Sequence, residues 1–397
     1  MATFSLTAGF IVTILFIQRL RSPIAKLPGP WYTTFTSWVL KYHEFASNRR
    51  LYIHNLHKRY GTAVRITPNE VSFASLEAIR EIYASGGSGY DKTELYDLFR
   101  QFGIKTMFST LDKHSGFVSR CAASAKSVDV YVLLHCYTHD GVTDFMFRPG
   151  GLRSLDSEND FEIMEELTYH QSLQKNLLHY YLPTLTAYFP SCLVPRRSPK
   201  TDEYVLRMSA QQRPSQHSLV AKLACKDSPL NHAQVAAECK DHMAAGIDTT
   251  GDGLCFLMWE LSQPHNIRFQ ERLYEELRAA DPNIPRKEAL RCAPPIPMSF
   301  PRYVPAGGRS IDGHSAPEKT IVSCQPYTVQ RLDESVFPEP DHFSPDRWID
   351  EKGAAKRNRL FFAFSTGARG CTGRNLAMVE MKVLLREVYS LYSYRRS

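Results

Sequence analysis

The residue with the clearest chemical setting is a cysteine near the end of the chain. Cys371 is flanked by Gly370 and Gly373, and Arg369 precedes it by two positions. Small neighbours allow backbone N–H groups to approach a sulfur atom and to hold its negative charge. The predicted helix 374–386 would place its positive N-terminal end beside the same sulfur. The pattern therefore predicts a metal-bound thiolate, with the arginine available to pair with an anionic group of a cofactor.

The ten residues around this cysteine follow a long motif. Phe364, Gly367, Arg369, Cys371 and Gly373 match the spacing F-x-x-G-x-R-x-C-x-G, which resembles the haem-ligand loop of the cytochromes P-450. The resemblance implies that Cys371 binds the iron of haem b and that the other four residues belong to the cofactor site. A buried structural cysteine in a glycine turn is the alternative interpretation.

A second motif lies inside the longest predicted helix, 232–262. The run Ala245-Gly246-Ile247-Asp248-Thr249-Thr250 places a glycine and two threonines in mid-helix, where they weaken the helix and allow a groove for a small ligand. It resembles the family's oxygen-binding helix, A/G-G-x-D/E-T-T. That resemblance implies that Thr249 hydrogen-bonds dioxygen and that Asp248 relays protons towards it. A glycine-kinked core helix is the alternative.

A third pattern concerns charged residues. Glu288 and Arg291 are three positions apart and share one face of a predicted helix. Downstream, the segment 343–348 resembles the family's F-x-P-x-R-W sequence and contains Arg347. The resemblance implies that these three residues form a buried structural charge set that holds the loop before the cysteine. In most proteins a lone E-x-x-R is only a surface pair.

Three further basic residues are candidates for the cofactor site. Arg302 matches an arginine that contacts a haem propionate in the family. His114 and Arg120 lie where the family carries another such residue, but the expected spacing from an aromatic residue is absent there. A solvated surface role is the alternative for both of them.

The elements that must position these residues are mostly helical. Periodicity predicts helices within 42–59, 128–182, 232–262, 269–280 and 374–386, two strands around a turn within 63–73, a strand hairpin from 311–314 and 320–323, and a linker at 191–218. The expected fold class is mainly α with small β-sheets (α+β). The resemblance implies a cytochrome P-450 fold, possibly incomplete, because too few residues remain for the helices that roof the pocket and because the chain stops at Ser397.

The N-terminal segment predicts membrane attachment. Residues 3–17 are uncharged and apolar, and two arginines follow. The run is shorter than the roughly 20 residues of a typical membrane span, yet a signal anchor fits better than a cleaved signal peptide or a buried helix. Leu27-Pro28-Gly29-Pro30 then predicts a stiff hinge. We expect an anchor at 1–21, a hinge at 22–31 and a haem-thiolate oxygenase domain at 32–397, facing the cytosol from the endoplasmic reticulum membrane.

Composition narrows the class of partner. The chain has 397 residues, 43% of them hydrophobic, and a formal net charge of +7. Its basic residues are scattered, so nothing local supports nucleic-acid binding, and a docking face for an acidic protein fits better. The nine cysteines contain no C-x-x-C pair, which argues against a disulfide framework or a zinc site and for reduced thiols.

The resemblance implies a haem-dependent monooxygenase that inserts one atom of dioxygen into an organic substrate. No G-x-G-x-x-G follows a predicted strand, so the electrons would come from a separate NADPH-dependent reductase at the membrane. The run Ala236 to Met243 resembles the sequence before the oxygen motif in fungal members of the family that act in secondary metabolism. Two alternatives stay open: a truncated, non-catalytic remnant, and a haem-thiolate isomerase or dehydratase. The sequence does not identify the substrate.

Overall fold

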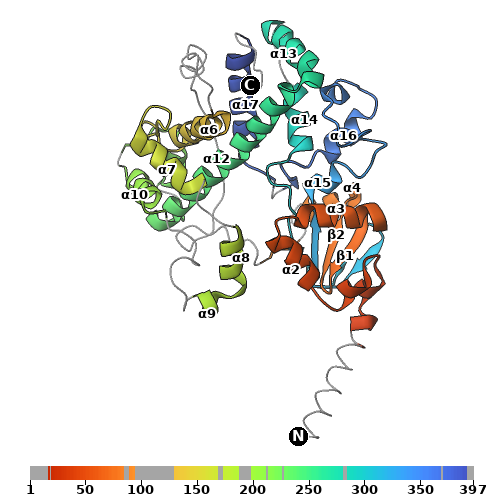
Figure 1. Cartoon of the computed structure of the whole chain (residues 1–397). Helices are drawn as coiled ribbons and strands as arrows, with labels where there is room; N and C mark the ends of the chain where they lie inside the picture. The colour runs from red at the N-terminus through yellow and green to blue at the C-terminus, as the bar shows by residue number, and fades with distance from the viewer. Residues whose placement is uncertain are drawn as a thin grey trace. The chain divides into compact units, whose positions relative to one another are not determined.

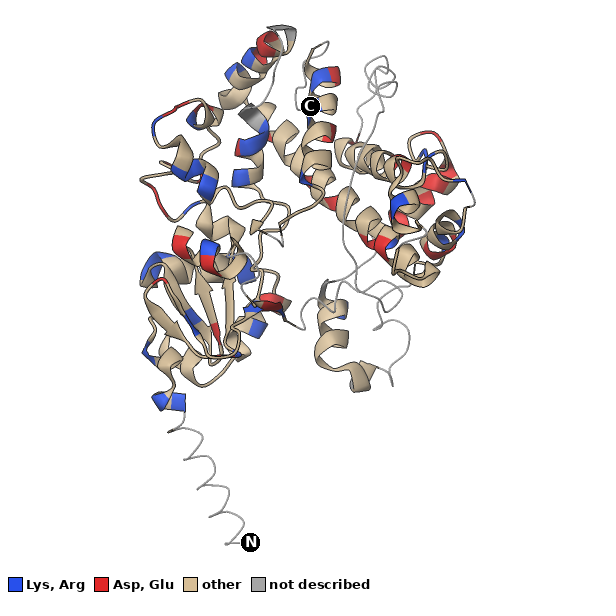
Figure 2. Ribbon diagram, turned by 180° about the vertical axis from the view of Figure 1, so that it is seen from behind, with Lys and Arg blue, Asp and Glu red and all other residues tan. Residues whose placement is uncertain are grey.

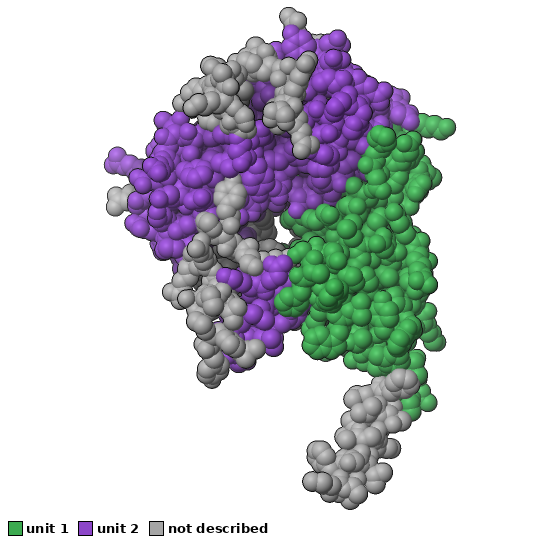
Figure 3. Space-filling view, in the orientation of Figure 1, with its two compact units in different colours: residues 1–95, 296–342, 352–370 green, residues 96–295, 343–351, 371–397 purple. Residues whose placement is uncertain are grey.

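The structure is a computed structural model that describes residues 17, 19–84, 89–93, 129–168, 173–186, 198–211, 213–225, 228–279, 284–367 and 370–390. Helices predominate and strands form two small sheets, which confirms the predicted α+β class. The chain divides into two compact units, both discontinuous in sequence (Figure 3). Unit 1 comprises 1–95, 296–342 and 352–370, and unit 2 comprises 96–295, 343–351 and 371–397.

Unit 1 is organised around a five-stranded sheet of order β1-β2-β7-β4-β3 (Figure 1). The strands are β1 Ala63–Thr67, β2 Glu70–Phe73, β3 Asp91–Lys92, β4 Arg302–Tyr303 and β7 Ile321–Cys324. The predicted pair within 63–73 is confirmed as the antiparallel β1–β2 hairpin. All five residues of β1 are buried, so this hairpin supplies part of the unit's core.

The other predicted hairpin is wrong in its pairing. β5 (Arg309–Ile311) pairs with β6 (His314–Ala316) in a separate two-stranded sheet. The segment Ile321–Cys324 instead runs parallel to β2 and antiparallel to β4. Its last three residues are buried, because apolar strand residues gain more from the larger sheet than from a short exposed hairpin.

The predicted hinge is held against unit 1 by a buried arginine of β1. The guanidinium of Arg65 donates hydrogen bonds to the carbonyl oxygens of Ala25, Leu27 and Pro30, at 2.7, 2.8 and 3.1 Å. Satisfied donors of this kind allow a charged side chain to be buried. The predicted anchor falls mostly outside the described residues. Within the described part of the chain, no helix is both long and apolar enough to cross a membrane.

The helix predicted for 42–59 consists of two helices. α2 spans Trp38–Phe45 and α3 spans Arg49–Tyr60, and Ser47 between them has a positive φ of 57°. A left-handed residue ends a helix. Ile53 and Leu56 are buried, whereas Leu51 is exposed. The remaining helical elements of unit 1 are η1 Pro23–Lys26, η2 Trp31–Thr34, α4 Leu76–Ile79, η3 Arg80–Ala84, α15 Pro326–Val329 and α16 Ala354–Leu360.

Unit 2 is built on α12, His232–Leu261, which α6, Val130–Phe147, accompanies side by side (Figure 1). A capping box at Asn231 and Gln234 begins α12, and the helix ends three residues before Pro264, as predicted. The glycine and threonines of the second motif do not interrupt it. An apolar cluster that includes Val142, Phe147 and Met243 fills the space between these two helices and their neighbours.

The predicted linker at 191–218 is wrong for residues 199–209, which form α10 (Pro199–Ser209). Pro199 occupies the first turn, where its missing N–H costs nothing. Thr201, Tyr204 and Val205 are buried, and α10 packs against α12 and α7 (Glu158–Thr168). Helical spacing of these residues was present in the sequence but was masked by the Pro- and Ser-rich composition around it.

Unit 2 contains further helices among the described residues. They are α8 Leu173–Tyr181, α9 Pro183–Thr186, α11 Leu219–Leu223, η5 Pro264–Asn266, α13 Ile267–Ala279, α14 Ile284–Cys292, η6 Pro345–Trp348 and α17 Arg374–Tyr389. The predicted helices within 269–280 and 374–386 are confirmed by α13 and α17. Figure 2 shows acidic and basic residues interspersed along the ribbon of both units, which agrees with the scattered charges of the sequence.

Candidate active site

The predicted thiolate stands at the start of α17. Gly373 is the N-cap of this helix, and the backbone N–H groups of Gly373 and Arg374 hydrogen-bond the sulfur of Cys371. Burial by the surrounding chain raises the pKa of the Cys371 thiol, although these two N–H groups and the charge of Arg374 act to lower it. One side of the residue stays exposed. The sulfur therefore has donors behind it and an open side for a ligand.

This donor set fits a haem iron. A thiolate is the soft ligand that haem-thiolate proteins use, and N–H groups at a helix start stabilise its charge. A Cβ atom on Gly373 would lie 3.8 Å from the sulfur, an ordinary van der Waals contact, so position 373 lies directly beside the sulfur. The residues present thus fit the cofactor implied by the motif.

The first half of the loop belongs to unit 1. Gly367 has a φ of 68°, and a Cβ atom there would lie 2.0 Å from the carbonyl oxygen of Tyr83. Only glycine can occupy this position, because both the conformation and the close approach exclude a side chain. Phe364 is half-buried and packs edge-on against Phe361. Arg369 lies outside the described residues, so its predicted role stays a prediction.

Arg302 is buried at the start of β4 in unit 1. Its Nη1 donates a hydrogen bond to the carbonyl of Pro301 at 2.9 Å, and its guanidinium lies 5.4 Å from the centre of the Tyr83 ring. The propionate contact of Arg302 stays a prediction. His114 and Arg120 lie outside the described residues.

The second motif exposes two functional groups on α12. The hydroxyl of Thr249 donates a 2.6 Å hydrogen bond to the carbonyl of Ala245 one turn earlier. Burial raises the pKa of Asp248 to about 6; the charge of Asp252 adds to the rise, whereas the charge of His135 and the hydroxyl of Thr168 oppose it. The Oδ1 atom of Asp248 is buried and has no hydrogen-bond partner among the described residues. Asp248 can therefore exchange a proton near neutral pH.

The predicted charge set is brought together within unit 2. Glu288 is fully buried and accepts hydrogen bonds from Nε and Nη2 of Arg291, at 3.0 and 2.9 Å, and from Nε of Arg347, at 2.9 Å. The backbone N–H of Ser344 and the indole N–H of Trp348 complete the shell, at 2.9 and 2.8 Å. The pattern E-x-x-R is here a buried structural pair and not a surface one.

Burial and hydrogen bonding act in opposite directions on the pKa of Glu288. Burial acts to raise the pKa of Glu288, but the hydrogen bonds and charge of Arg291, the charge of Arg347 and the N–H of Ser344 outweigh it and hold the pKa below its usual range. Glu288 is consequently an ionised residue that ties α14 to η6. The resemblance to the family's motifs implied this set, and only the Glu288–Arg291 pair follows from spacing on one helix.

The motifs in the sequence did not point to two polar residues nearby, His135 and Asp252. His135 of α6 is fully buried, and its Nε2 lies 3.5 Å from Oδ1 of Asp252 on α12. No local pattern marks a pairing between two helices that are a hundred residues apart in the chain. The spacing of Asp248 and Asp252, one helical turn, was the only signal.

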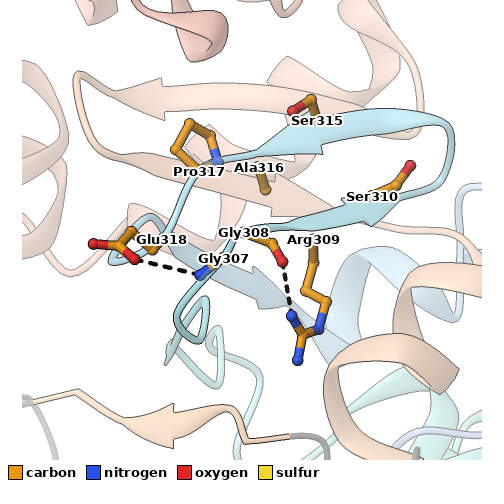
Figure 4. A pocket seen from close by; sticks show the side chains of 8 residues that line it. All are labelled: Gly307, Gly308, Arg309, Ser310, Ser315, Ala316, Pro317 and Glu318. Carbon is orange, nitrogen blue, oxygen red and sulfur yellow. Dashed lines mark hydrogen bonds between the residues drawn. The ribbon is translucent and has the colours of Figure 1, made fainter.

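An open groove in unit 1 is unrelated to these motifs. It is lined by Gly307 to Ser310 and by Ser315 to Glu318, along the β5–β6 hairpin (Figure 4). The backbone N–H of Gly307 donates to Glu318, and Arg309 donates to the carbonyl of Gly308. These hydrogen bonds pair polar groups of the hairpin with one another. The residues that line the groove do not form an arrangement typical of catalysis.

Comparison with known proteins agrees with the motifs. The family model described as cytochrome P450 matches residues 286–395, from α14 through the cysteine loop and α17. The chain is 24% identical to cytochrome P450 monooxygenase orf2 of Aspergillus niger over 94% of this chain and 86% of the relative. It is 26% identical to cytochrome P450 monooxygenase BipB of Cochliobolus sativus over 97% and 88%. Benzoate 4-monooxygenase bphA of Aspergillus niger is 25% identical over 94% and 88%.

The chain is similar to fungal cytochrome P450 monooxygenases over most of its length, and these matches support a haem-dependent monooxygenase function. The alignments with the first and third of these relatives extend over 440 and 461 positions, more than the 397 residues of this chain. The relatives therefore carry internal residues that have no counterpart here, which agrees with the expected internal shortening.

Proposed function

We propose that Cys371 is the iron ligand of haem b, and that the chain uses the cofactor to oxygenate a small organic substrate of fungal secondary metabolism. The observation that carries this proposal is the sulfur of Cys371 at the start of α17, with the N–H groups of Gly373 and Arg374 directed at it. When bound, a thiolate-ligated haem activates dioxygen, because electron donation by sulfur favours cleavage of the O–O bond.

The chain's own residues offset part of the burial that raises the pKa of the Cys371 thiol. Metal ligation requires a deprotonated thiol. Two backbone donors, the positive end of α17 and the cationic side chain of Arg374 all favour the thiolate.

Asp248 and Thr249 would transfer and position protons beside the cofactor. The hydroxyl of Thr249 donates its hydrogen bond to the carbonyl of Ala245. The hydroxyl oxygen can therefore still accept a hydrogen bond through its lone pairs. Asp248 has a pKa of about 6 and a buried Oδ1. A carboxyl poised near the working pH can both release and recover a proton during turnover. We assign proton delivery to Asp248 and positioning of the proton acceptor to Thr249.

The proposal also covers the source of the electrons and the attachment of the chain to a membrane. Monooxygenation consumes two electrons, and the sequence has no dinucleotide-binding fingerprint that would supply them. We assign their delivery to a separate NADPH-dependent reductase. The apolar residues 3–17 and the arginines after them support an N-terminal anchor in the endoplasmic reticulum membrane, with the catalytic part in the cytosol. Arg302 and Arg369 stay predicted cofactor contacts.

Replacement of Thr249 tests the assigned roles. In Thr249→Ala, reductase-dependent consumption of NADPH should continue, while the fraction of electrons recovered in product falls several-fold and peroxide rises. Thr250→Ala is the matched control, because Thr250 follows on the same helix but its side chain is buried away from the motif's exposed face. Equal coupling in Thr249→Ala and wild type would contradict the proposal.

A further inference from the structure

Two predicted cofactor residues of unit 1 contact the same tyrosine. Arg302 and Gly367 are far apart in the chain, yet Tyr83 of η3 touches both of them. Its ring lies against the guanidinium of Arg302, and its backbone lies against Gly367. Tyr83 is itself buried. A single buried residue that contacts two parts of a predicted site can fix the distance between them.

The backbone of Tyr83 packs directly on the cysteine loop. η3 is a π-helical turn, and turns of this kind are rare and occur frequently at functional sites. A Cβ atom on residue 367 would lie 2.0 Å from the carbonyl oxygen of Tyr83 and 2.8 Å from the Cα atom of Ala84. Because residue 367 is glycine, the two backbones touch with no side chain between them. The position of this part of the loop therefore depends on Tyr83.

The hydroxyl of Tyr83 joins two further segments of unit 1. It donates a 2.6 Å hydrogen bond to the carbonyl of Phe300. It accepts a 2.9 Å hydrogen bond from the backbone N–H of Cys324, the last residue of β7. The hydroxyl proton and one of the oxygen lone pairs are thus both used. Phe300 lies two residues before Arg302, so the first of these bonds holds the backbone that leads into Arg302.

The ring of Tyr83 restrains the guanidinium of Arg302. The guanidinium carbon lies 5.4 Å from the ring centre, which is within the range of a cation–π interaction. Nη1 of Arg302 donates to the carbonyl of Pro301 at 2.9 Å. The ring and this carbonyl together limit a side chain that otherwise has many rotamers. The ring of Tyr83 also packs against Phe362, with 5.3 Å between the ring centres, on the segment that leads into the cysteine loop.

Space filling alone does not explain this set of contacts. A tyrosine that only fills a core needs apolar neighbours for its ring and one hydrogen-bond partner for its hydroxyl. Tyr83 instead uses its carbonyl, its hydroxyl and its ring on different segments of unit 1. Two of these contacts end on Gly367 and Arg302, which the sequence predicts as cofactor-binding residues. The arrangement is therefore that of a residue that positions a site.

We propose that Tyr83 is a positioning residue of the haem site, which holds the guanidinium of Arg302 at a fixed distance from the cysteine loop so that its charge reaches a carboxylate of the cofactor. This inference rests on the proposed function, because it requires Arg302 to contact a haem propionate. A cation held there favours the reduced haem, which carries one more negative charge than the oxidised haem. Tyr83 acts through Arg302 and not by contact with the cofactor.

A double-mutant cycle on the Fe(III)/Fe(II) reduction potential of the haem-loaded full chain tests this inference. Arg302→Gln should make the potential more negative, because a positive charge is lost. Tyr83→Phe should shift it in the same direction by a smaller amount, since it frees the backbone at Phe300 but keeps the ring. Tyr83→Leu also removes the ring and should shift it further. In the Arg302→Gln background neither substitution of Tyr83 should add to the shift, because residues that act through one another are not additive.

Tyr52 supplies the matched controls in unit 1. Its hydroxyl lies 3.2 Å from that of Tyr32, and its ring stacks on His43. Tyr52→Phe and Tyr52→Leu therefore remove the same kinds of contact without touching Arg302, and both should leave the potential at the wild-type value. Tyr83→Phe keeps the shape of the side chain, so it decides the question even where Tyr83→Leu does not fold.

Three results would overturn the inference while leaving the proposed function intact. They are an unchanged potential in Arg302→Gln, a Tyr83→Phe potential equal to that of Tyr52→Phe, and a Tyr83→Phe shift of equal size with and without Arg302. The carbon monoxide spectrum of the reduced wild type, recorded on the same preparations, separates these failures from that of the proposed function. A wild type that lacks the red-shifted Soret band would contradict the proposed function and the inference that rests on it.

Discussion

Glu288→Gln should destabilise unit 2 strongly, because it removes a buried charge from two arginines. The substitution keeps the shape of the side chain, so it leaves no cavity. Arg291 is fully buried and donates two of its hydrogen bonds to this carboxylate, and Arg347 donates a third. Leaving a buried partner unpaired costs about 3–5 kcal/mol, against a total unfolding free energy of about 5–15 kcal/mol for a typical protein.

Urea denaturation followed by circular dichroism measures this loss. Glu276→Gln is the matched control, since Glu276 pairs with Arg272 on the surface of α13 and Arg272 retains a second partner in Asp346. Such exposed pairs contribute about 0–1 kcal/mol. Equal losses of unfolding free energy in the two variants would refute the argument that Glu288 is a buried, ionised partner.

The same carboxyl predicts an acid dependence. The pKa of Glu288 in the folded protein is lowered, so its contribution is complete above the unfolded value of about 4.3 and is lost as the pH falls through the lower folded value. Wild type should therefore lose stability below about pH 4 more steeply than Glu288→Gln does. Parallel pH profiles of the unfolding free energy would contradict this sign.

Two further substitutions test the packing around α12. Gly251→Ala should lower the unfolding free energy by about 1–3 kcal/mol through overpacking against the His135 ring. Gly253→Ala should change it by less than about 1 kcal/mol, because the nearest atom to its Cβ is the flexible end of Leu290 at 3.3 Å and the next, of Met381 and Pro295, lie at 3.5 and 3.7 Å. Thermal unfolding of both variants would decide, and a reversed order would contradict the contact. Glu380 of α17 is buried, neither carboxylate oxygen has a partner among the described residues, and burial raises its pKa to about 8. Because its folded pKa is raised, stability should fall as pH rises from about 4 to 8, by up to about 1.4 kcal/mol per pH unit, and Glu380→Gln should flatten that profile in urea titrations; an unchanged profile would contradict a neutral, buried Glu380.

Local sequence patterns predicted the elements that carry the site. The Asn231 cap and the Gln263-Pro264 stop bound α12 because helix ends depend on nearby residues. Glu288 and Arg291 meet because they are three residues apart on one helix. The glycine positions of the cysteine loop were predictable for the same reason, since Gly367 needs a conformation that few other residues adopt.

Pairings between distant segments were not predictable in this way. The β7 strand joins β2 across a gap of about 250 residues, and His135 meets Asp252 only after α6 has packed on α12. The burial of Arg65 depends on carbonyl oxygens that the distant hinge supplies. α10 was hidden because its stability comes from buried contacts with α12 and α7 and not from strong helix-forming composition.

The assignment of Cys371 as iron ligand is the central claim, and one spectrum tests it most directly. The purified protein, loaded with haem and reduced under carbon monoxide, should show the strongly red-shifted Soret band of a thiolate-ligated haem. Cys371→Ala should lose that band, while Cys225→Ala, which replaces another exposed thiol, should keep it. A wild-type spectrum without the red-shifted band, or a band that survives in Cys371→Ala, would contradict the claim.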